Sequence, residues 1–418
     1  MHDILPEEQG YFKKVYHVAE NLAEVYGFKR IEVPVLEQAE LYEKGTGLTT
    51  DIVEKQMFSL KTRGGDVLAM RPEFTPGIVR AFLQHGMLNL PQPVKLYTLG
   101  PVFRHESPQA GRFRQFNQID FEVLGEQSQA VDAQIIQIFY NLLTELKFKN
   151  PIVEINSIGA SCCRPYFKKV LSSYLRSRLN SLCLDCKRRF RENPLRVLDC
   201  KDEKCQPIKA QAPQIIDHLC EDCHNHFKGV LEFLDELGLP YRLNPYLVRG
   251  IDYYTKTVFE IFAQTANQEE APIALVGGGR FDNLAKVIGN RDVPACGAAA
   301  GVERIVDGLK KNGLRLPEEL QKDLFLAQVG DLAKRKSLKL FEEFRKEKIP
   351  LAESLSKDSL KVQLSRADRF KVRYALIVGQ KEALDKTVIL RDMRNGVQET
   401  VNMEKIVHEV KKRLKKKK

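Results

Sequence analysis

Two arginines, a carboxylate and an aromatic ring follow one another closely in the segment 103–116. Arg104 and Glu106 precede a short polar loop, and Arg112 and Phe116 come after it. Guanidinium groups bind phosphate through paired hydrogen bonds, an aromatic ring stacks on a nucleobase, and a carboxylate accepts from an exocyclic amine. The spacing therefore suits a nucleoside triphosphate, although a basic hairpin on a solvated face has the same pattern.

A third arginine, Arg304, lies near the start of the segment 296–311, which predicts a helix entered through small residues. Small residues allow a backbone or a ligand to approach closely, but tight helix–strand packing beside a solvated arginine is the alternative. No GxxxxGK[ST] loop occurs, and the glycine run 276–280 is not a GxGxxG fingerprint. That run is typical of backbone lying against a ligand or a neighbouring strand. The sequence shows no Ser/His/Asp or Cys/His pattern that would indicate nucleophilic catalysis.

Six of the nine cysteines form three closely spaced pairs between residues 183 and 223. Paired CxxC spacing in a reducing compartment is the usual signal for a structural zinc site, whereas unligated thiols in a small domain are the alternative. Six cysteines are too many for one tetrahedral ion. The expected ligands are Cys183, Cys186, Cys220 and Cys223, with Cys200 and Cys205, or His224 and His226, as further candidates. Cys162, Cys163 and Cys296 are expected to be ordinary small core residues.

Strands in runs, with few helices between them, must position these residues. The pattern predicts a helix from residue 6 to 26 and an amphipathic helix over 131–148. It predicts a short strand from residue 28 that ends at Pro34, and further strands over 94–106, 114–125, 151–159, 246–263 and 271–279. Such an arrangement favours a largely antiparallel sheet.

Two further regions differ in pattern from this body. Residues 164–240 are predicted to be helical and carry the paired cysteines, and residues 322–418 alternate strand and helix, as in a compact α/β domain with a mostly parallel sheet. The expected domains are 1–163 and 241–315 for one core, 164–240 for an insertion, and 322–418 for a C-terminal domain. At 418 residues the chain is long enough for two or three domains.

The net charge of +11 is concentrated in the C-terminal region. Residues 322–418 hold 26 Lys and Arg against 14 Asp and Glu, whereas the rest of the chain holds 40 against 41. A basic unit joined to a neutral one suggests that a polyanion such as nucleic acid is held beside a catalytic body. Seven of these charges lie in the tail 411–418, which is alternatively a solvated end.

The chain carries no run of eighteen apolar residues, and its N-terminus lacks the basic-then-apolar pattern of a secretory signal. We therefore expect a cytoplasmic protein without membrane association, in which the cysteines stay reduced.

Taken together, the chain resembles histidyl-tRNA synthetases over nearly its whole length. The helix and strand ending at Pro34, the segment from FRHE to RFRQFNQIDFEVLG, and GAAAGVERI are similar to motifs 1, 2 and 3 of class II aminoacyl-tRNA synthetases. LVRGIDYYTKTVFE (247–260) and ALVGGGRFDNL (274–284) resemble segments that distinguish the histidine family, and MRPEFTPG (70–77) resembles its substrate loop. Phe281 stands where the family usually has tyrosine, a loss of one hydroxyl that should be tolerable.

The resemblance implies an α/β fold with an α+β catalytic domain. That fold is the class II synthetase antiparallel sheet flanked by helices, with a helical insertion and a C-terminal α/β anticodon-binding domain. It implies a homodimer built through motif 1. The implied enzyme is a histidine–tRNA ligase with L-histidine, ATP with Mg²⁺, and tRNA(His) as its substrates and partners.

Residue roles also follow from the resemblance. In the ATP site, Arg104 would hold the α-phosphate, Glu106 and Phe116 the adenine, and Arg112 and Arg304 the β- and γ-phosphates. The histidine-binding residues would be Glu73, Phe74, Thr75, Arg104, Gln118, Glu122, Arg249, Tyr253 and Tyr254.

The expected catalytic residues are Arg104 and Arg249. The resemblance places the Arg249 guanidinium between the substrate carboxylate and the α-phosphate, where other class II enzymes use a metal ion. A fixed cation there offsets the repulsion of two anions. Glu122 and Tyr254 would bond the two imidazole nitrogens, which offer one donor and one acceptor.

Two alternatives remain open at this point. Some synthetase-like proteins are non-catalytic regulatory subunits of histidine biosynthesis that bind histidine, but they usually lack the arginine segment and the C-terminal domain. The threonine, proline and glycine synthetases share a related C-terminal domain, although the LVRGIDYYT segment argues against them.

Overall fold

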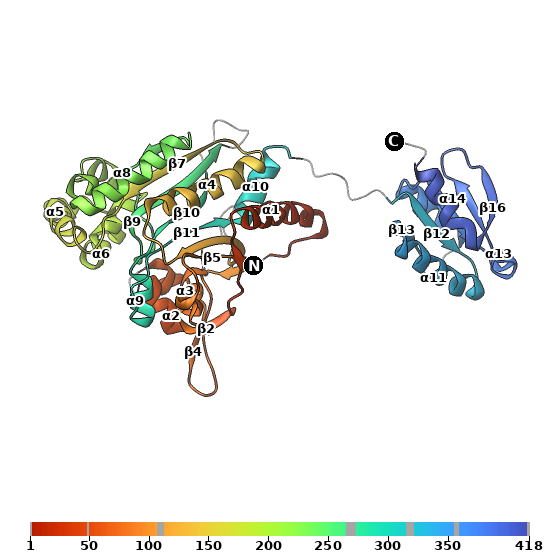
Figure 1. The fold of residues 1–418 in the computed structure, drawn as a ribbon, viewed down its shortest axis with the longest axis horizontal. Helices are drawn as coiled ribbons and strands as arrows, with labels where there is room; N and C mark the ends of the chain where they lie inside the picture. The colour runs from red at the N-terminus through yellow and green to blue at the C-terminus, as the bar shows by residue number, and fades with distance from the viewer. Residues whose placement is uncertain are drawn as a thin grey trace. The chain divides into compact units, whose positions relative to one another are not determined.

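The computed structural model describes residues 2–47, 50–106, 113–264, 273–314, 322–354 and 359–415. The chain divides into two compact units, Met1–Arg315 and Leu316–Lys418 (Figure 1). Within the described ranges, no helix combines the length and the apolar character that a membrane crossing requires.

An eight-stranded sheet is the centre of the first unit, with strand order β1-β5-β6-β11-β10-β9-β7-β8. All pairings are antiparallel except those of the two edge strands, β1 with β5 and β8 with β7. The strands are β1 (Lys29–Arg30), β5 (Val94–Phe103), β6 (Gln115–Leu124), β7 (Lys149–Ser157), β8 (Tyr241–Leu243), β9 (Thr255–Gln264), β10 (Ile273–Arg280) and β11 (Ala295–Gly301). The largely antiparallel sheet expected from the sequence is therefore present.

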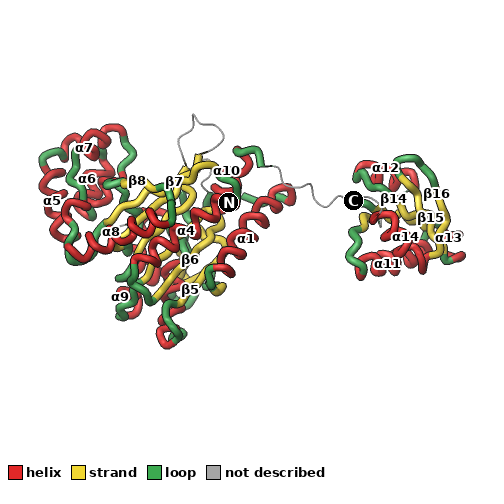
Figure 2. The backbone as a smooth tube through the Cα atoms, turned by 45° about the horizontal axis from the view of Figure 1, so that its top comes forward, coloured by secondary structure: helices red, strands yellow, loops and turns green. Residues whose placement is uncertain are grey.

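Four helices pack through their apolar sides on one face of this sheet and form its main core (Figure 2). They are α1 (Pro6–Val25), α4 (Gln129–Glu145), α8 (Glu221–Glu236) and α10 (Val302–Lys311). Alternate side chains of β6 point into this core, including Ile119, Phe121 and Val123. The opposite side chains of β6 are left for the other face, where the polar residues gather.

The other face carries α3 (Thr75–Gln84) and α9 (Leu284–Gly289), which share a second core with the insertion. A small antiparallel sheet precedes α3 in the chain. It consists of β2 (Leu36–Gln38), β3 (Ser59–Lys61) and β4 (Val67–Met70), with α2 (Ala39–Thr46) and the π-helix η1 (Ile52–Gln56) between β2 and β3.

The insertion lies between β7 and β8 and consists of helices and short turns. Its elements are α5 (Arg164–Arg176), η3 (Leu179–Ser181), α6 (Leu184–Glu192), η4 (Pro194–Asp199), η5 (Glu203–Cys205), α7 (Gln206–Ala210), η6 (Ile215–His218) and α8. The helical character expected for residues 164–240 is present, and α8 also packs on the central sheet.

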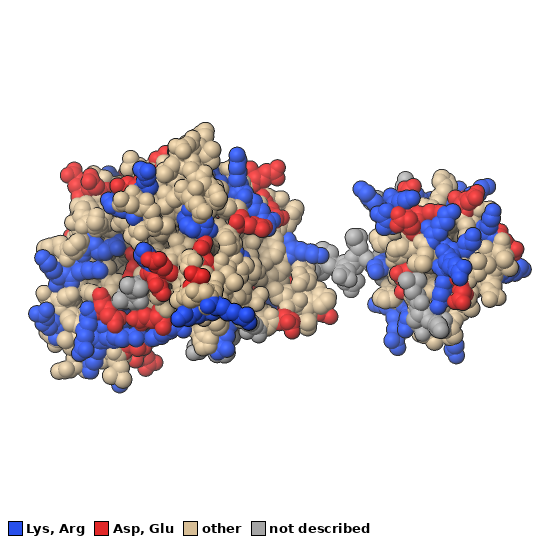
Figure 3. Space-filling model, turned by 90° about the horizontal axis from the view of Figure 1, so that it is seen from below, with Lys and Arg blue, Asp and Glu red and all other residues tan. Residues whose placement is uncertain are grey.

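The second unit has its own apolar core around a five-stranded sheet of order β13-β12-β14-β15-β16. Its elements are β12 (Leu324–Gln328), α11 (Asp331–Lys346), β13 (Leu351–Glu353), α12 (Leu360–Arg369), β14 (Tyr374–Val378), α13 (Gln380–Asp385), β15 (Thr387–Asp392), β16 (Gln398–Asn402) and α14 (Met403–Lys415). Basic side chains are prominent on the face of this unit that Figure 3 shows.

Three local expectations from the sequence are wrong. The C-terminal sheet is only half parallel, because β15 and β16 are antiparallel hairpin strands. The strand expected over 246–263 begins only at Thr255, and the RGIDYY segment before it is a loop. The small residues 295–301 form strand β11 rather than the entrance of a helix, so α10 starts at Val302.

Candidate active site

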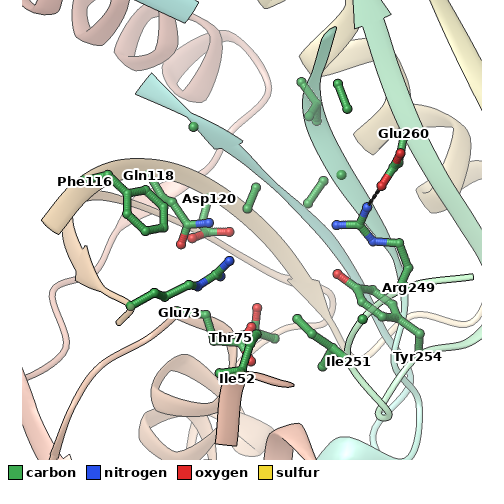
Figure 4. A pocket seen from close by; sticks show the side chains of 18 of the residues that line it. Ile52, Glu73, Thr75, Phe116, Gln118, Asp120, Arg249, Ile251, Tyr254 and Glu260 are labelled. Carbon is green, nitrogen blue, oxygen red and sulfur yellow. Dashed lines mark hydrogen bonds and ion pairs between the residues drawn. The ribbon is translucent and has the colours of Figure 1, made fainter. Parts of the chain in front are cut away.

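A cavity of about 360 Å³ opens on the face of the central sheet opposite the main helices. Its walls come from β6, β10, β11, the loop before β9, the start of α3 and the insertion. Figure 4 shows Phe116, Gln118 and Asp120 on one side of this cavity and Arg249 and Tyr254 on the other.

Strand β6 supplies polar side chains at every second position. Phe116, Gln118 and Asp120 line the cavity, and Glu122 follows on the same face of the strand. Oε1 of Gln118 and Oδ2 of Asp120 are buried without a hydrogen-bond partner among the described residues. Because an unpartnered buried polar atom costs free energy, these atoms are suited to bind a polar ligand.

Glu73 lines the cavity from a position two residues before the start of α3. Its two carboxylate oxygens accept hydrogen bonds from the hydroxyls of Thr46 at 3.0 Å and Tyr253 at 2.7 Å. Thr75, at the start of α3, donates to Oε1 of Glu122 at 2.7 Å. These bonds fix the orientation of two carboxylates that come from different elements.

Three buried carboxyl groups, those of Glu73, Asp120 and Glu122, lie within a short distance of one another. Burial raises the pKa of Glu73, while the hydrogen bonds from Tyr253 and Thr46 act in the opposite direction. Burial also raises the pKa of Asp120 and of Glu122 well above the ordinary carboxyl value, and repulsion from neighbouring carboxylates adds to both shifts. The site therefore favours a positively charged ligand group, which would relieve this repulsion.

Tyr253 and Tyr254 are buried at the end of the loop that precedes β9. Their ring centroids lie 4.7 Å apart, and the ring of Phe281 packs on Tyr253 at 5.6 Å. Both tyrosines and Phe281 line the cavity. They form an aromatic wall with two hydroxyl groups, a surface suited to a flat polar ring.

Arg249 lies at the far side of the cavity, where its Nη1 donates to Oε1 of Glu260 (Figure 4). Burial is the largest single influence on the pKa of Arg249 and lowers it, but the negative groups around it, Glu260 foremost, together raise the pKa, so the guanidinium stays charged. Its Nε is buried without a partner among the described residues. The guanidinium lies against Gly277, where an added Cβ would come within 2.3 Å of Nη2.

Two other arginines line the same cavity. Arg104 donates from Nε to the carbonyl oxygen of Pro72 at 2.9 Å, and its guanidinium lies 5.4 Å from the ring centroid of Phe116. Arg304, in the first turn of α10, donates to the carbonyl oxygen of Ala274 at 3.2 Å. Together with Arg249, they place three cations in the cavity that Glu73 and Asp120 also line.

The structure brings together most of the residues that the sequence singled out. Those that line the cavity are Glu73, Thr75, Arg104, Glu106, Phe116, Gln118, Arg249, Tyr253, Tyr254 and Arg304. Glu122 is not in the lining but contacts it through Thr75. Arg112 and the loop 107–111 lie outside the described residues.

Phe74 does not belong to this cavity. Its ring is buried in the second core and lies 4.5 Å from the guanidinium of Arg71. The side chain of Phe74 therefore points into the core, while those of Glu73 and Thr75 point into the cavity.

Sequence reasoning missed several polar lining residues, among them Asp120, Glu260, Arg196 and Asp199. The alternation of polar residues along β6 could have identified Asp120. The two residues of η4 carry no comparable signal, because only the folding of the insertion brings them to the cavity.

The cysteines form two groups of four rather than the single site expected from the two CxxC motifs. We call Cys162, Cys163, Cys220 and Cys223 the base cluster, and Cys183, Cys186, Cys200 and Cys205 the inner cluster. Within each group, all four sulfur atoms lie within 4.8 Å of one another. The expected set of Cys183, Cys186, Cys220 and Cys223 is thus divided between the two clusters.

Other expectations for this region also change. Cys162 is exposed and joins the base cluster with Cys163, so neither is a plain core residue. His226 is buried, with Nε2 3.3 Å from Oδ1 of Asp132, and belongs to neither cluster. His224 is exposed and also lies outside both clusters. Cys296 is a buried core residue, as expected.

Comparison with known proteins gives consistent results over the whole chain. A family model for histidyl-tRNA synthetase matches residues 1–160 and 201–305, and a model for an anticodon binding domain matches residues 323–413. The histidine–tRNA ligase of Halothermothrix orenii is 40% identical over 411 residues, which cover 98% of this chain and 97% of that protein. The histidine–tRNA ligase of Dehalococcoides mccartyi is 40% identical over 412 residues, covering 99% and 98%.

Solved structures agree with this result. The apo histidyl-tRNA synthetase of S. aureus superposes with a TM-score of 0.80 at 29% identity, over 98% of this chain and 97% of that one. A protein described as an ATP phosphoribosyltransferase regulatory subunit/histidyl-tRNA synthetase, from Bacillus halodurans C, has a TM-score of 0.64 at 19% identity and covers 91% of this chain. That second likeness concerns the fold alone.

The two-unit architecture, the sheet with its three-arginine cavity, and sequence identity of about 40% along nearly the full length lead to one conclusion: this chain belongs to the histidyl-tRNA synthetase family of class II aminoacyl-tRNA synthetases.

Proposed function

We propose that this protein is a histidine–tRNA ligase, which activates L-histidine with ATP and transfers it to the 3′ end of tRNA(His). The observation that carries the proposal is one cavity whose lining combines buried carboxyl groups and two tyrosines with three arginines. The carboxyl groups and tyrosines suit an amino acid with a polar ring, and the arginines suit a triphosphate. The full-length relatives described above are histidine–tRNA ligases, which supports the same reaction.

Histidine would bind beside β6 and the two tyrosines. Its α-ammonium group suits Glu73 and Gln118, with Thr75 between them and Asp120 adding negative charge. Its imidazole offers one donor and one acceptor, which Glu122 and Tyr254 can satisfy. A site that hydrogen-bonds a polar side chain rejects apolar analogues by roughly 10⁴–10⁵, because such ligands leave its polar groups unpaired.

ATP would bind beside the arginines that line the cavity. The ring of Phe116 is available to stack on adenine, with Glu106 beside it, and Arg104 would contact the α-phosphate. Arg304 would contact the outer phosphates, and we extend that role to Arg112.

Mg²⁺ would enter with the phosphates, since in such sites it commonly binds phosphate oxygens and water with only one or two protein carboxylates. It would offset the charge of the leaving pyrophosphate. Glu303 is the acidic group beside Arg304, but its oxygens already accept three hydrogen bonds from Asn117. Few protein ligands to this ion are therefore expected there.

The chemistry is an in-line displacement followed by acyl transfer. A carboxylate oxygen of histidine attacks the α-phosphorus, a new oxygen–phosphorus bond forms, and the bond to pyrophosphate breaks. Arg249 and Arg104 would stabilise the charge that develops at phosphorus, in place of bulk water. The terminal ribose hydroxyl of tRNA then attacks the activated carbonyl, loses its proton and displaces AMP.

The second unit would bind the anticodon. The match of residues 323–413 to an anticodon binding domain and the excess of basic side chains support this role. We further propose that residues 1–163 and 241–315 form the catalytic core and that residues 164–240 form an insertion in it. The protein would be cytoplasmic, and it would form a homodimer through the motif 1 elements α1 and β1.

Histidine-dependent exchange of radiolabelled pyrophosphate into ATP tests the activity directly. We expect exchange with histidine and none above background with threonine, proline or glycine. Exchange that prefers another amino acid would overturn the substrate, and histidine binding without any exchange would favour a regulatory subunit. Charging of tRNA(His) in the same preparation tests the second step.

A further inference from the structure

The two cysteine clusters share one construction. In each cluster, a CxxC pair begins a helix and a second pair of cysteines closes on it from another segment. Cys183 and Cys220 are the N-cap residues of α6 and α8, and Cys186 and Cys223 lie one turn later. The same arrangement appears twice, from sequences that are not repeats of each other.

The sulfur–sulfur distances within each cluster suit one tetrahedral metal ion per cluster. The Sγ of Cys162 lies 3.0 Å from that of Cys220 and 3.6 Å from that of Cys223, and Cys183 and Cys200 are 3.8 Å apart. Four sulfurs bound to zinc at about 2.3 Å would lie roughly 3.8 Å from one another. A disulfide requires about 2.05 Å, and an iron–sulfur cluster separates some of its cysteines further, because they bind two or four different irons.

Backbone amides around the inner cluster point at sulfur. Cys186 N donates to Sγ of Cys183, Cys183 N to Sγ of Cys205, and Asp202 N to Sγ of Cys200, each at 3.4 Å. N–H groups and helix N-termini stabilise thiolates, the form that binds metal. Unligated thiols that pack as small apolar groups would have no need of three such donors.

Most of the eight cysteines lie in a part of the insertion that is built from short elements and lies outside the family match. The histidyl-tRNA synthetase model leaves residues 161–200 unmatched, and five of the eight cysteines lie there. That part of the insertion consists of short helices and turns. Short elements of this kind are commonly held together by a structural metal.

We propose that the insertion binds two structural Zn²⁺ ions, one in the base cluster and one in the inner cluster, each through four cysteine thiolates. The base ion joins the segment after β7 to the start of α8 and so closes the insertion at its two ends. The inner ion lies wholly within the loop that the base ion closes.

The inner ion has a consequence for the active site. Cys200 directly follows η4, which carries Arg196 and Asp199 into the cavity wall. Arg196 and Arg189 hold Asp51, another lining residue, through ion pairs of 2.8 and 3.3 Å. The inner ion would therefore fix one wall of the catalytic cavity from outside it.

Elemental analysis of the untagged full-length protein, purified under reducing conditions after growth with zinc, gives the first test. We expect two zinc ions per chain, without iron or sulfide. X-ray absorption at the zinc edge of the same sample should show four sulfur ligands at about 2.3 Å and no nitrogen. This measurement needs no variant, so a folding defect cannot obscure it.

Variants test the pairing. Cys200→Ser and Cys162→Ser should each reduce the content from two zinc ions to one, and Cys296→Ser, a buried cysteine outside both clusters, should keep two. A single ion held by the two CxxC motifs would instead give one zinc in the wild type and no loss in Cys200→Ser. Zinc near zero, bound iron, or a disulfide in the reduced preparation would each overturn the proposal.

Pyrophosphate exchange tests the role of the inner ion, and this part rests on the proposed function. Cys200→Ser should raise the KM for histidine or ATP roughly tenfold by loosening the cavity wall, whereas Cys296→Ser should not. If the wild type held two zinc ions but showed no exchange, the proposed function would fail while the metal sites stood. If Cys200→Ser lost a zinc with unchanged KM, the link to the cavity wall would be wrong.

Discussion

The guanidinium of Arg249 lies directly against the bare backbone of Gly277, in space that any Cβ atom would fill. An added Cβ would come within 2.3 Å of Nη2 and 2.6 Å of Cζ. The position of the Arg249 guanidinium therefore depends on the absence of a side chain at Gly277, although 28 positions separate the two residues in the chain.

Gly277→Ala tests the contact between Gly277 and Arg249 without removing a charge. Displacement of the guanidinium by about 1 Å should lower kcat for histidine-dependent exchange roughly 10–100-fold, because such shifts misalign reacting groups. The matched control is Gly64→Ala in the exposed β3–β4 turn, where an added Cβ meets nothing closer than 3.7 Å. Equal activity in both variants would show that the contact has no catalytic importance.

Arg249→Ala removes the cation itself. We expect adenylate formation to fall by about 10²–10³, the usual loss when a preorganised charge is removed from a transition state. tRNA binding should remain nearly unchanged. Arg242→Ala, which breaks an ion pair with Glu154 outside the cavity, serves as the control. Exchange within a few-fold of the wild type in Arg249→Ala would contradict the proposed role.

Asp120→Asn should stabilise the protein while weakening substrate binding. Burial and the nearby Glu73 raise the pKa of Asp120 above its unfolded value, so the charged form opposes folding at neutral pH. We expect the variant to raise Tm at pH 7 by roughly 2–4 °C and to raise the KM for histidine, since the α-ammonium group loses a charge partner.

The same shift predicts a pH dependence. Because protonation of Asp120 favours the folded state, lowering the pH through the raised pKa should increase the stability of the wild type relative to Asp120→Asn. Over the same range, histidine affinity should fall more steeply in the wild type. Comparing the two proteins cancels the titration of histidine itself. Parallel curves would contradict the prediction.

Arg280 should be essential for folding rather than catalysis. It is fully buried, and its guanidinium contacts Asp132, Asp282 and the carbonyl oxygens of Glu126 and Ser128. Arg280→Met leaves the Asp132 carboxylate buried without this partner and should cost about 3–5 kcal/mol of unfolding free energy in urea titrations. Asp292→Asn, which removes an exposed partner of Lys286, should cost less than about 1 kcal/mol.

Removing the second unit separates the two reaction steps. A chain ending at Arg315 should keep histidine-dependent exchange, since residues 1–315 form a compact unit with their own core. Charging of tRNA(His) should become much weaker and lose much of its salt dependence, because phosphate contacts are lost. Charging at the wild-type rate would exclude an anticodon-binding role for this unit.

Local sequence patterns were sufficient for the long elements. The apolar periodicity of α1 and α4, and the alternation along β5 and β6, identify helices and strands whose buried sides coincide with the pattern. The ordered motifs indicated the family, and most of the cavity residues were found through them. These features depend on neighbours in the chain, so a linear reading can recover them.

Other features depend on which strands become neighbours. Residues 295–301 have good helix propensity, yet they form the strand between β6 and β10. There a Cβ on Gly297 would collide with Glu122 at 1.5 Å, and one on Gly278 with Ala298 at 2.3 Å. Small residues are required at these positions because side chains of adjacent strands occupy the space.

Residues able to bind a metal, phosphate or a cation can be recognised in the sequence, because those properties belong to each side chain. How these residues are grouped follows from the three-dimensional fold. It separated the two CxxC motifs into different clusters, brought η4 of the insertion to the catalytic cavity, and turned Phe74 away from it. Such groupings depend on contacts between distant segments, so they cannot be predicted from the spacing of residues within one segment.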